Sequence, residues 1–579
     1  MLYPQRNKYR QFIDLSGFWD FRFDINNEGL KENWQSGFDK SQPIAVPASW
    51  NDQFADNRDF LGPAWYQTYF DLPWAWTEQK IILRFGSVNY IAEVWLNGDQ
   101  LGQHEGGHIP FEFDVTSKLK AQNNHLVVRV DGNLADDRVP PGGRPMFYPA
   151  TNFDFFPYCG IHRPVLLYSI PNNGIEDITV RTFIEGDKAK VQMIIEYAEK
   201  SSLTARFTII GHGANISKSI IIDDKMGECT MEVQKAVLWE PDHPNLYELT
   251  VELLKNEVTF DSYQLKIGIR TIEVSGDQLL LNGKPIELIG VAKHIDFPIT
   301  GRGYNPAVII KDYSLMKWIG ANSFRTSHYP YSEQMMDLAD QLGFLVIDET
   351  PAVGLTFHKR HIERHLELCK QYTRELIARD KNHPSVIIWS LANEPHSSTK
   401  SKEFFRELYD LSKGLDPTRL VTVINMQGVR DRAFEFLDIV CMNRYYAWYI
   451  GPGQIDEGCE DLSKEIDKFY QKYKKPIILT EFGADAIPGW HSQPPEMFSE
   501  EYQVDFLKKY IELINSKPYV IGQHIWNMCD FKTPQGIHRV GAYNYKGVFT
   551  RDRRPKMAAH LLKKLWNQKQ DKQFVIKRT

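Results

Sequence analysis

Two glutamates stand directly after apolar runs in the second half of the chain, in positions suited to acid–base chemistry. Glu394 closely follows the run VIIWSL, and Glu481 ends the run PIILTE. Glycoside hydrolysis is the main reaction class that needs only two carboxylates, one as proton donor and one as nucleophile or base. Asp348 and Glu349 are rival acids, but two acids at one strand end cannot easily face each other across a substrate.

The apolar runs belong to a strand-then-helix pattern that fills the last half of the chain. They are nearly all apolar rather than alternating, as expected for parallel strands covered by helices. Helical stretches such as YSEQMMDLADQLG, which Gly343 should stop, lie between them. Eight such units in about 300 residues predict a (β/α)8 barrel. The expected strands are 287–293, 322–327, 344–349, 386–391, 420–425, 438–443, 476–481 and 521–526.

Polar residues end most of these strands, and the active site of such a barrel lies at the C-terminal ends of its strands. A metal-dependent hydrolase would need a His and Asp cluster there, for which His294, Asp296 and His328 are the only candidates. A buried histidine held by one hydrogen bond is commoner than a functional one. The other strand-end residues are Lys293, Arg325, Thr326, Tyr329, Asn393, Asn443, Arg444, Tyr445, Tyr446, Trp526 and Asn527.

The first 270 residues have a different pattern, in which short β-type runs end in Asn-Gly or Asp-Gly turns. Alternate apolar residues mark half-buried strands, as in 191–197 and 247–253. The turn residues Pro171 to Gly174 suggest a boundary between two β domains, the second of sandwich size. The predicted domains are therefore 1–171, 172–270 and 271–579.

Composition restricts the partners and the compartment. A net charge of −6 over 579 residues argues against nucleic acid as the main partner. The polar start MLYPQRNKYR and the lack of an apolar run of about 18 residues predict a cytoplasmic protein that does not bind membranes. The six cysteines are scattered, which predicts reduced thiols and no zinc site. The 13% of aromatic residues fits large cores and sugar stacking equally well.

Three motifs carry a resemblance to a known family. WSLANEP (389–395) looks like the acid/base signature of the large glycosidase clan built on this barrel. ILTEFGAD (478–485) resembles its nucleophile segment, and NFDFFPYCGIHRPV (152–165) resembles the signature of glycoside hydrolase family 2. The resemblance covers essentially the whole chain. It implies an N-terminal β jelly-roll, an immunoglobulin-like β-sandwich and a C-terminal (β/α)8 TIM barrel.

The resemblance also implies roles for the strand-end residues. Glu394 is similar to the family's general acid/base, and Asn393 to the residue that hydrogen-bonds the sugar 2-hydroxyl. Glu481 matches the nucleophile of a retaining enzyme, so Glu481 must be charged while Glu394 holds a proton. Donors such as Arg325 and Tyr446 are expected to keep Glu481 charged. The mechanism requires no cofactor and no metal.

A second set of motifs bears on the sugar. Asn544-Tyr545-Lys546 resembles the Asn-x-Lys motif with which β-glucuronidases of the family bind the C6 carboxylate. Alone, NYKG would be an ordinary surface turn, but GVFTRDRRPK (547–556) resembles β-glucuronidases closely as well. Two residues separate the preceding Arg539-Val540-Gly541 from this motif, one more than in familiar relatives. The remaining residues that the resemblance assigns to the substrate are Asp154, His294, His328, Tyr445, Tyr446, Tyr449, Trp526 and Arg539.

The predicted function is therefore a retaining, exo-acting β-glucuronidase that acts on small-molecule or oligosaccharide glucuronides. Only 24 residues (352–375) precede LIARD (376–380), so the chain resembles gut bacterial members that lack the long active-site loop. Relatives are often oligomers, which implies a homo-oligomer, and some loop-less relatives bind flavin mononucleotide. A β-galacturonidase, a β-galactosidase, a β-mannosidase and a non-catalytic carbohydrate-binding protein remain alternatives. Lys546 argues against the neutral sugars of a β-galactosidase or β-mannosidase, because they carry no carboxylate for it to bind. The presence of both Glu394 and Glu481 argues against a binding protein, because binding alone does not require the pair.

Overall fold

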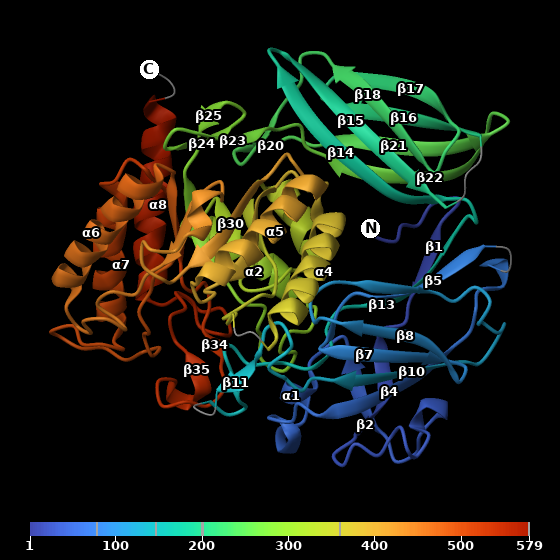
Figure 1. Cartoon of the computed structure of the whole chain (residues 1–579), viewed down its shortest axis with the longest axis horizontal. Helices are drawn as coiled ribbons and strands as arrows, with labels where there is room; N and C mark the ends of the chain where they lie inside the picture. The colour runs from blue at the N-terminus through green and yellow to red at the C-terminus, as the bar shows by residue number, and fades with distance from the viewer. Residues whose placement is uncertain (77–78, 145–146, 199–201, 358–359, 577–579) are drawn as a thin grey trace.

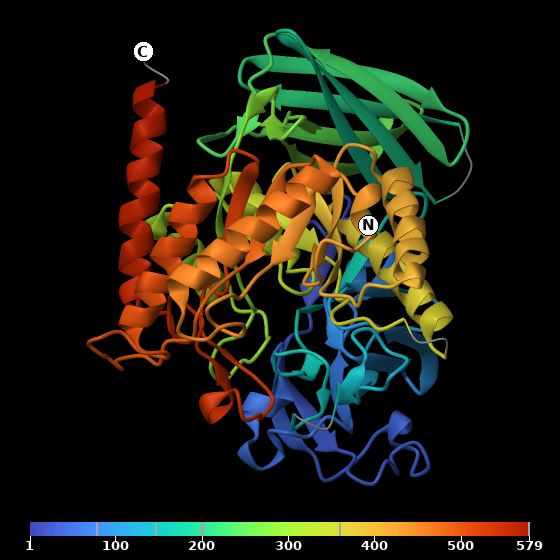
Figure 2. The same ribbon diagram turned by 60° about the vertical axis from the view of Figure 1, so that its left-hand side comes forward.

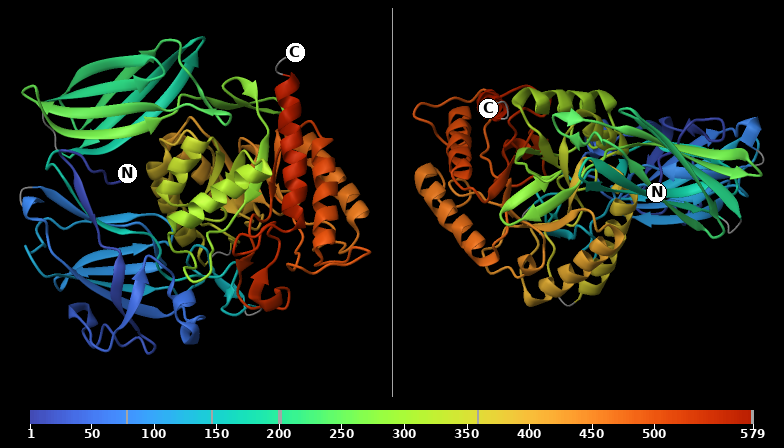
Figure 3. Two further views of the ribbon diagram at one scale, coloured as in Figure 1. Left: turned by 180° about the vertical axis from the view of Figure 1, so that it is seen from behind. Right: turned by 90° about the horizontal axis from the view of Figure 1, so that it is seen from above.

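Three bodies of secondary structure follow one another along the chain, and both β bodies lie along one side of the C-terminal barrel (Figure 1). The computed structural model describes residues 1–76, 79–144, 147–198, 202–357 and 360–576. None of the helices in these ranges has the length and apolar character needed to cross a membrane. Views from behind and from above give the same arrangement (Figure 3).

The first body consists mainly of two antiparallel sheets that enclose a hydrophobic core. The expected Asn-Gly turn joins two of its strands, and Asn97 and Gly98 both have positive φ, at 55° and 91°. One sheet has the order β1 (Gln11–Asp14), β13 (Val165–Ile170), β5 (Lys80–Phe85) and β9 (Phe111–Asp114). The other has the order β3 (Gln42–Val46), β2 (Gly17–Phe23), β4 (Pro63–Phe70), β10 (Asn124–Asp131), β7 (Ile91–Leu96) and β8 (Asp99–Glu105).

The second body is the predicted immunoglobulin-like sandwich. The alternation expected for 191–197 and 247–253 is confirmed, because the apolar residues of each run are buried and face one core. Its sheets are β14 (Ile175–Glu185), β15 (Lys188–Tyr197) and β18 (Met226–Val233), and β17 (Ala214–Ile222), β16 (Leu203–Gly211), β21 (Tyr247–Lys255) and β22 (Val258–Ile267).

Eight parallel strands close into the predicted barrel, and every strand lies in or overlaps its expected range. Parallel strands buried on both faces account for their continuous apolar sequence. The strands are β26 (Leu288–Ala292), β27 (Ser323–Arg325), β28 (Leu345–Glu349), β29 (Val386–Asn393), β30 (Leu420–Asn425), β31 (Val440–Asn443), β32 (Ile477–Glu481) and β33 (Val520–Ile525).

Seven helices surround the barrel, and α8 stands on the side away from the β bodies (Figure 2). Gly343 ends α3 with φ 74°, as its position in the sequence predicts. The expectation of eight strand–helix units is wrong for the fifth, because the fully described stretch between β30 and β31 holds only the 3₁₀ turn η4 (Ala433–Glu435). The helices are α2 (Pro306–Ile319), α3 (Glu333–Leu342), α4 (Ile362–Asp380), α5 (Thr399–Leu415), α6 (Ile455–Tyr473), α7 (Glu500–Asn515) and α8 (Met557–Ile576).

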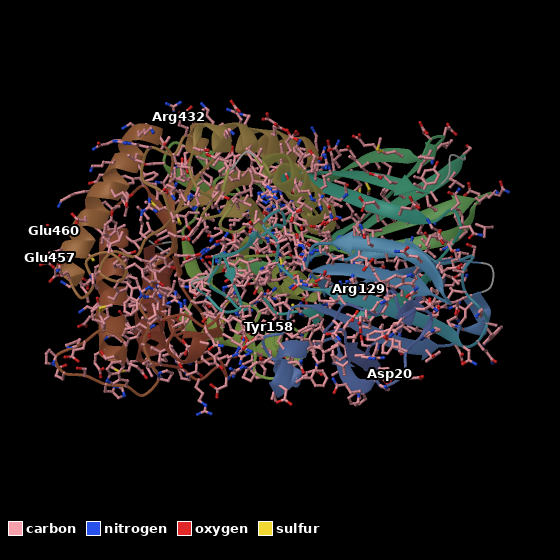
Figure 4. The ribbon with its side chains drawn as sticks, turned by 60° about the horizontal axis from the view of Figure 1, so that its bottom comes forward. Asp20, Arg129, Tyr158, Arg432, Glu457 and Glu460 are labelled. Carbon is pink, nitrogen blue, oxygen red and sulfur yellow. The ribbon has the colours of Figure 1, made fainter. Side chains whose placement is uncertain are left out.

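The first body is joined to the barrel by a buried polar contact near Tyr158, which Figure 4 labels at their boundary. The Arg551 guanidinium donates to Asp296 at 2.8 Å, to Asp52 at 2.6 Å and to the Tyr158 hydroxyl at 2.7 Å. Beside it, Phe153 belongs to the hydrophobic cluster of the barrel. The segment that precedes Tyr158 is thereby held over the barrel mouth.

We predict that Arg551→Ala destabilises this junction by about 3–5 kcal/mol, because it leaves the buried Asp296 without its cation, whereas Asp52 keeps Lys532. Differential scanning calorimetry should show a lower temperature for the first unfolding transition. Arg554→Ala is the matched control, since Arg554 is largely exposed and pairs only with the neighbouring Asp552. Equal effects of the two substitutions would contradict the prediction.

Candidate active site

A cavity of about 260 Å³ lies at the C-terminal ends of the barrel strands. Strand ends of the barrel form its floor, and the segment around Asp154 from the first body forms part of its wall. It brings together nine of the residues expected in the site, which are Asp154, His328, Asn393, Glu394, Tyr445, Tyr449, Glu481, Trp526 and Arg539. It is also lined by Phe147, Asn152, Phe153, Phe155, Val353, Gly354, His396 and Met426.

Glu481 is the last residue of β32, and its side chain is held by two donors. Arg325, which ends β27, donates to Oε1, and the Tyr445 hydroxyl donates to Oε2 at 2.7 Å. Burial and the neighbouring Glu394 together raise the pKa of Glu481 to about 8, although Arg325 and Tyr445 act in the opposite direction. The expectation that Arg325 supports the charge of Glu481 is thus consistent with their contact.

Glu394 directly follows β29, with φ 50°. Its Oε1 accepts a hydrogen bond from the Asn443 amide at 2.8 Å, and the same amide donates to Asn393 at 3.1 Å. Asn443 is oriented in turn by Thr480, whose hydroxyl donates to its amide oxygen at 2.9 Å. Burial raises the pKa of Glu394 as well.

The raised pKa of both carboxyls, about 8 for Glu481, favours a proton shared within the pair at neutral pH. The contacts favour Glu394 as the residue that holds it. Glu481 accepts from a guanidinium and a phenol, which stabilise its charged form, whereas among the described residues Glu394 accepts from a neutral amide alone. The arrangement therefore provides a charged carboxylate and a protonated carboxyl in one cavity, as double displacement at a glycosidic bond requires.

The predicted carboxylate-binding residues lie together but are already paired. Arg539 donates from Nε to Asp154 at 2.7 Å and also contacts the second oxygen of that carboxylate. The Asn544 amide donates to Asp154 at 2.9 Å. Lys546 contacts Asp485 and lies 2.9 Å from the Tyr449 hydroxyl. Arg539 lines the cavity, whereas Asn544 and Lys546 are each 1% exposed and lie behind its surface.

Tyr446 and His294, which were expected to contact the substrate, do not line the cavity. The Tyr446 hydroxyl donates to Glu465 at 3.2 Å, so the expectation that Tyr446 supports Glu481 is wrong and Tyr445 does so instead. His294 lies behind the cavity, where its Nδ1 is 3.0 Å from the Tyr329 hydroxyl and its ring packs edge-on against Trp526. Strand periodicity ends at Asn443, so spacing does not distinguish the adjacent tyrosines.

Sequence reasoning missed Asn443 and Asp485 as functional neighbours. Asp485 is buried and lies four residues after Glu481, and its other oxygen accepts from the Tyr545 backbone at 2.6 Å. It thus connects the nucleophile segment to the loop that carries Lys546. The position of Asp485 at the end of ILTEFGAD was the only available signal, and Asn443 had none beyond its strand-end position.

The residues proposed for a metal-dependent hydrolase have other partners. Asp296 accepts from Arg551 at 2.8 Å, and His328 Nδ1 lies 2.9 Å from Glu349. Among the described residues, the group with metal-ligand spacing is Asp337, Asp340 and His383, away from this cavity. His383 and Asp340 form an ion pair of 2.6 Å there. The geometry of the cavity favours paired acids over a metal centre.

Family models match nearly all of the chain. The sugar binding domain of glycosyl hydrolases family 2 matches residues 12–171, a second model of the family matches 173–270, and its TIM barrel domain matches 272–570. The chain belongs to glycosyl hydrolase family 2. The fold predicted for the three parts of the chain is confirmed by these matches and by the closed barrel.

Relatives of known name span the whole chain. A Beta-glucuronidase from Paenibacillus borealis is 39% identical over 98% of this chain and 99% of its own length, and one from Felis catus is 39% identical over 97% and 92%. A solved Beta-glucuronidase of an uncultured Clostridium sp. is similar, with a TM-score of 0.92 and 40% identity over 98% of this chain and 100% of that one. The Ruminococcus gnavus β-glucuronidase in complex with D-glucaro 1,5-lactone has a TM-score of 0.92 and 36% identity, covering 98% and 99%.

We predict that Glu481→Gln resists heat better than wild type, and that this advantage grows as the pH rises from about 6 to about 9. Glutamates in the unfolded chain lose their protons near pH 4.3, whereas the folded pair keeps one proton up to about pH 8. The folded state therefore binds more protons and loses relative stability as the pH rises. Glutamine carries no charge at any of these values.

Thermal unfolding of both proteins across this pH range tests the prediction. Glu460→Gln is the control, because Glu460 is exposed on α6 (Figure 4) and its removal should give no pH-dependent difference. A constant difference between Glu481→Gln and wild type would contradict the linkage.

Proposed function

We propose that the chain is a retaining, exo-acting β-glucuronidase that uses Glu394 as general acid/base and Glu481 as nucleophile. The observation that carries the proposal is the pair of unequal carboxyl environments in one cavity, with Arg325 and Tyr445 on Glu481 and only Asn443 on Glu394. Full-length similarity to several relatives named Beta-glucuronidase supports it.

In the first step, Glu394 gives its proton to the glycosidic oxygen while the Glu481 carboxylate attacks the anomeric carbon. The bond from that carbon to the leaving oxygen breaks, the aglycone alcohol departs, and a glycosyl ester with Glu481 forms. In the second step, the charged Glu394 takes a proton from a water molecule, whose oxygen attacks the same carbon. The ester bond breaks, glucuronic acid leaves with retained configuration, and Glu394 regains its proton.

Other residues of the cavity bind the sugar in this proposal. Asn393 is oriented by the Asn443 amide to meet the 2-hydroxyl, and Trp526 provides an aromatic surface beneath the ring. Tyr449 and the cations Arg539 and Lys546 bind the C6 carboxylate, which requires fixed donors in a partly buried site. Asp154, His328 and Asn544 complete the site, whereas the positions of His294 and Tyr446 support only indirect roles.

Several further features are proposed from the sequence. The enzyme lacks the long active-site loop of some gut bacterial members, although residues 358–359 of this stretch lie outside the described part of the chain. Catalysis needs no cofactor, and the protein is a cytoplasmic homo-oligomer. The domain boundaries lie near residues 171 and 270, where the matches to the family models also divide.

Hydrolysis of p-nitrophenyl β-D-glucuronide, β-D-galacturonide, β-D-galactoside and β-D-mannoside by the purified protein tests the proposed activity. We expect a strong preference for the glucuronide, and trapping with a 2-deoxy-2-fluoro-glucuronyl fluoride should label Glu481. Preference for the galacturonide would favour the C4 epimer, and preference for a neutral sugar would overturn the role of Lys546. Turnover of none of them would favour a carbohydrate-binding protein.

We predict that Lys546→Ala lowers kcat/KM for the glucuronide by about 30-fold to several thousand-fold, since a buried charge-assisted contact is worth roughly 2–5 kcal/mol. Asp485→Asn is the matched control, because it removes the partner of Lys546 while keeping the cation. Steady-state kinetics should show a smaller loss for Asp485→Asn. An unchanged kcat/KM in Lys546→Ala would rule out its recognition role.

A further inference from the structure

A buried carboxylate that the proposed mechanism does not use lies directly behind Glu481. Arg325 divides its guanidinium between two carboxylates: Nη1 donates to both oxygens of Glu349 at 2.8 Å, and Nη2 contacts Glu481. Arg325 and Glu349 are both 0% exposed. Glu349 holds Nη1 of Arg325 and thereby fixes the position of Nη2, which contacts Glu481.

Glu349 also determines which ring nitrogen of His328 carries the hydrogen. Burial lowers the pKa of His328 to about 4, so the ring is neutral. Its Nδ1 lies 2.9 Å from Glu349 Oε1, and a lone pair at Nδ1 would face the carboxylate oxygen, although Arg325 Nη1 is also 3.2 Å away. Nδ1 therefore holds the hydrogen and donates it to Glu349, which leaves an acceptor at Nε2.

The Nε2 acceptor of His328 belongs to the reaction site. The ring stacks on Trp526 with centroids 4.9 Å apart, it lines the cavity, and Nε2 lies 3.7 Å from Glu481 Oε1. A sugar hydroxyl can donate to this nitrogen or to the charged Glu481. His328 Nε2 depends on the contact between Nδ1 and Glu349. Glu481 depends on Glu349 indirectly, through Arg325.

The neighbouring acid Asp348 provides a contrast on the same strand. Burial and Asp380 raise the pKa of Asp348 well above its usual range, which favours its protonated form, and it accepts from the Thr326 hydroxyl at 2.9 Å. Burial alone would also raise the pKa of Glu349, but Arg325 and His328 hold it below its usual value. Ser390 donates to its Oε2 at 2.8 Å, so both oxygens are satisfied.

We propose that Glu349 is a positioning residue for hydrolysis, which orients Arg325 against the nucleophile and fixes His328 as a hydrogen-bond acceptor for the sugar. This role rests on the proposed function of Glu481. The charged and titratable groups that face Glu481 are Arg325 of β27, His328 after it, Glu349 of β28, Glu394 after β29 and Tyr445 after β31.

Glu349→Gln tests the proposal, because it removes the charge and keeps the shape. We expect kcat/KM for p-nitrophenyl β-D-glucuronide to fall about 10- to 100-fold. Losses of this size follow when a residue that orients a metal ligand is replaced, and Glu349 orients Arg325 and His328 in a comparable way. The acid limb of the pH–kcat/KM profile should move to lower pH by about one unit, since Arg325 then acts on Glu481 alone. A merely structural role would lower the melting temperature and leave this limb in place.

Two further variants make the outcome specific. Asp348→Asn replaces one neutral group by another and should leave the pH profile unchanged. Ser390→Ala removes a donor from Glu349 without disturbing its charge, so the acid limb should move slightly to higher pH, opposite to Glu349→Gln. Should Glu349→Gln fail to fold, an unmoved limb in Ser390→Ala would overturn the proposal.

Trapping with the 2-fluoro glucuronyl fluoride separates this proposal from the nucleophile assignment. If Glu481 is labelled in Glu349→Gln and the acid limb is shifted, both the nucleophile assignment and the role of Glu349 are supported. A label on Glu481 with an unmoved limb overturns the role of Glu349 alone. A label on another carboxylate overturns both.

Discussion

The active site depends on one buried cation. Arg325 has no exposed surface and must be compensated where it lies, because an unpaired charge in such surroundings is strongly destabilising. Glu349 and Glu481 both compensate it. Because Glu349 also holds the guanidinium, Arg325 does not depend on Glu481 alone for compensation, which is what the proposed role of Glu481 as nucleophile requires.

The first body supplies part of the wall of the active-site cavity. The mouth of the barrel is completed by the segment that carries Phe153, Asp154 and Phe155. The Arg551 contact with Asp52 and Asp296 holds this segment against the barrel. The first body is therefore part of the site, because residues of both this body and the barrel line the cavity.

Much of this arrangement could be predicted from the sequence. Continuous apolar runs identified all eight barrel strands. Position at the strand ends made Glu394 and Glu481 candidates beside Asp348 and Glu349, since that position fixes where a residue lies, and the family resemblance selected the first two. Residues beyond the strand ends were less predictable. Tyr445 and Tyr446 are adjacent in a loop without regular period, and only one of them reaches Glu481.

Contacts between charged side chains of distant segments could not be predicted from the sequence either. The ion pair of Lys546 with Asp485 was not predicted, because an ion pair between two loops leaves no pattern in either. The same holds for Glu349 and Asp348, which are neighbours of similar chemistry on one strand. Burial next to Arg325 keeps the first charged, and burial next to Asp380 keeps the second neutral.

Arg539 is paired with Asp154, which belongs to the first body. If Arg539 binds the C6 carboxylate as proposed, the carboxylate of a glucuronide competes with Asp154 for one guanidinium. A neutral sugar carries no group that competes for it. Under the proposed function, discrimination between acidic and neutral sugars then depends on a competition within the protein, and the competing carboxylate belongs to a different domain.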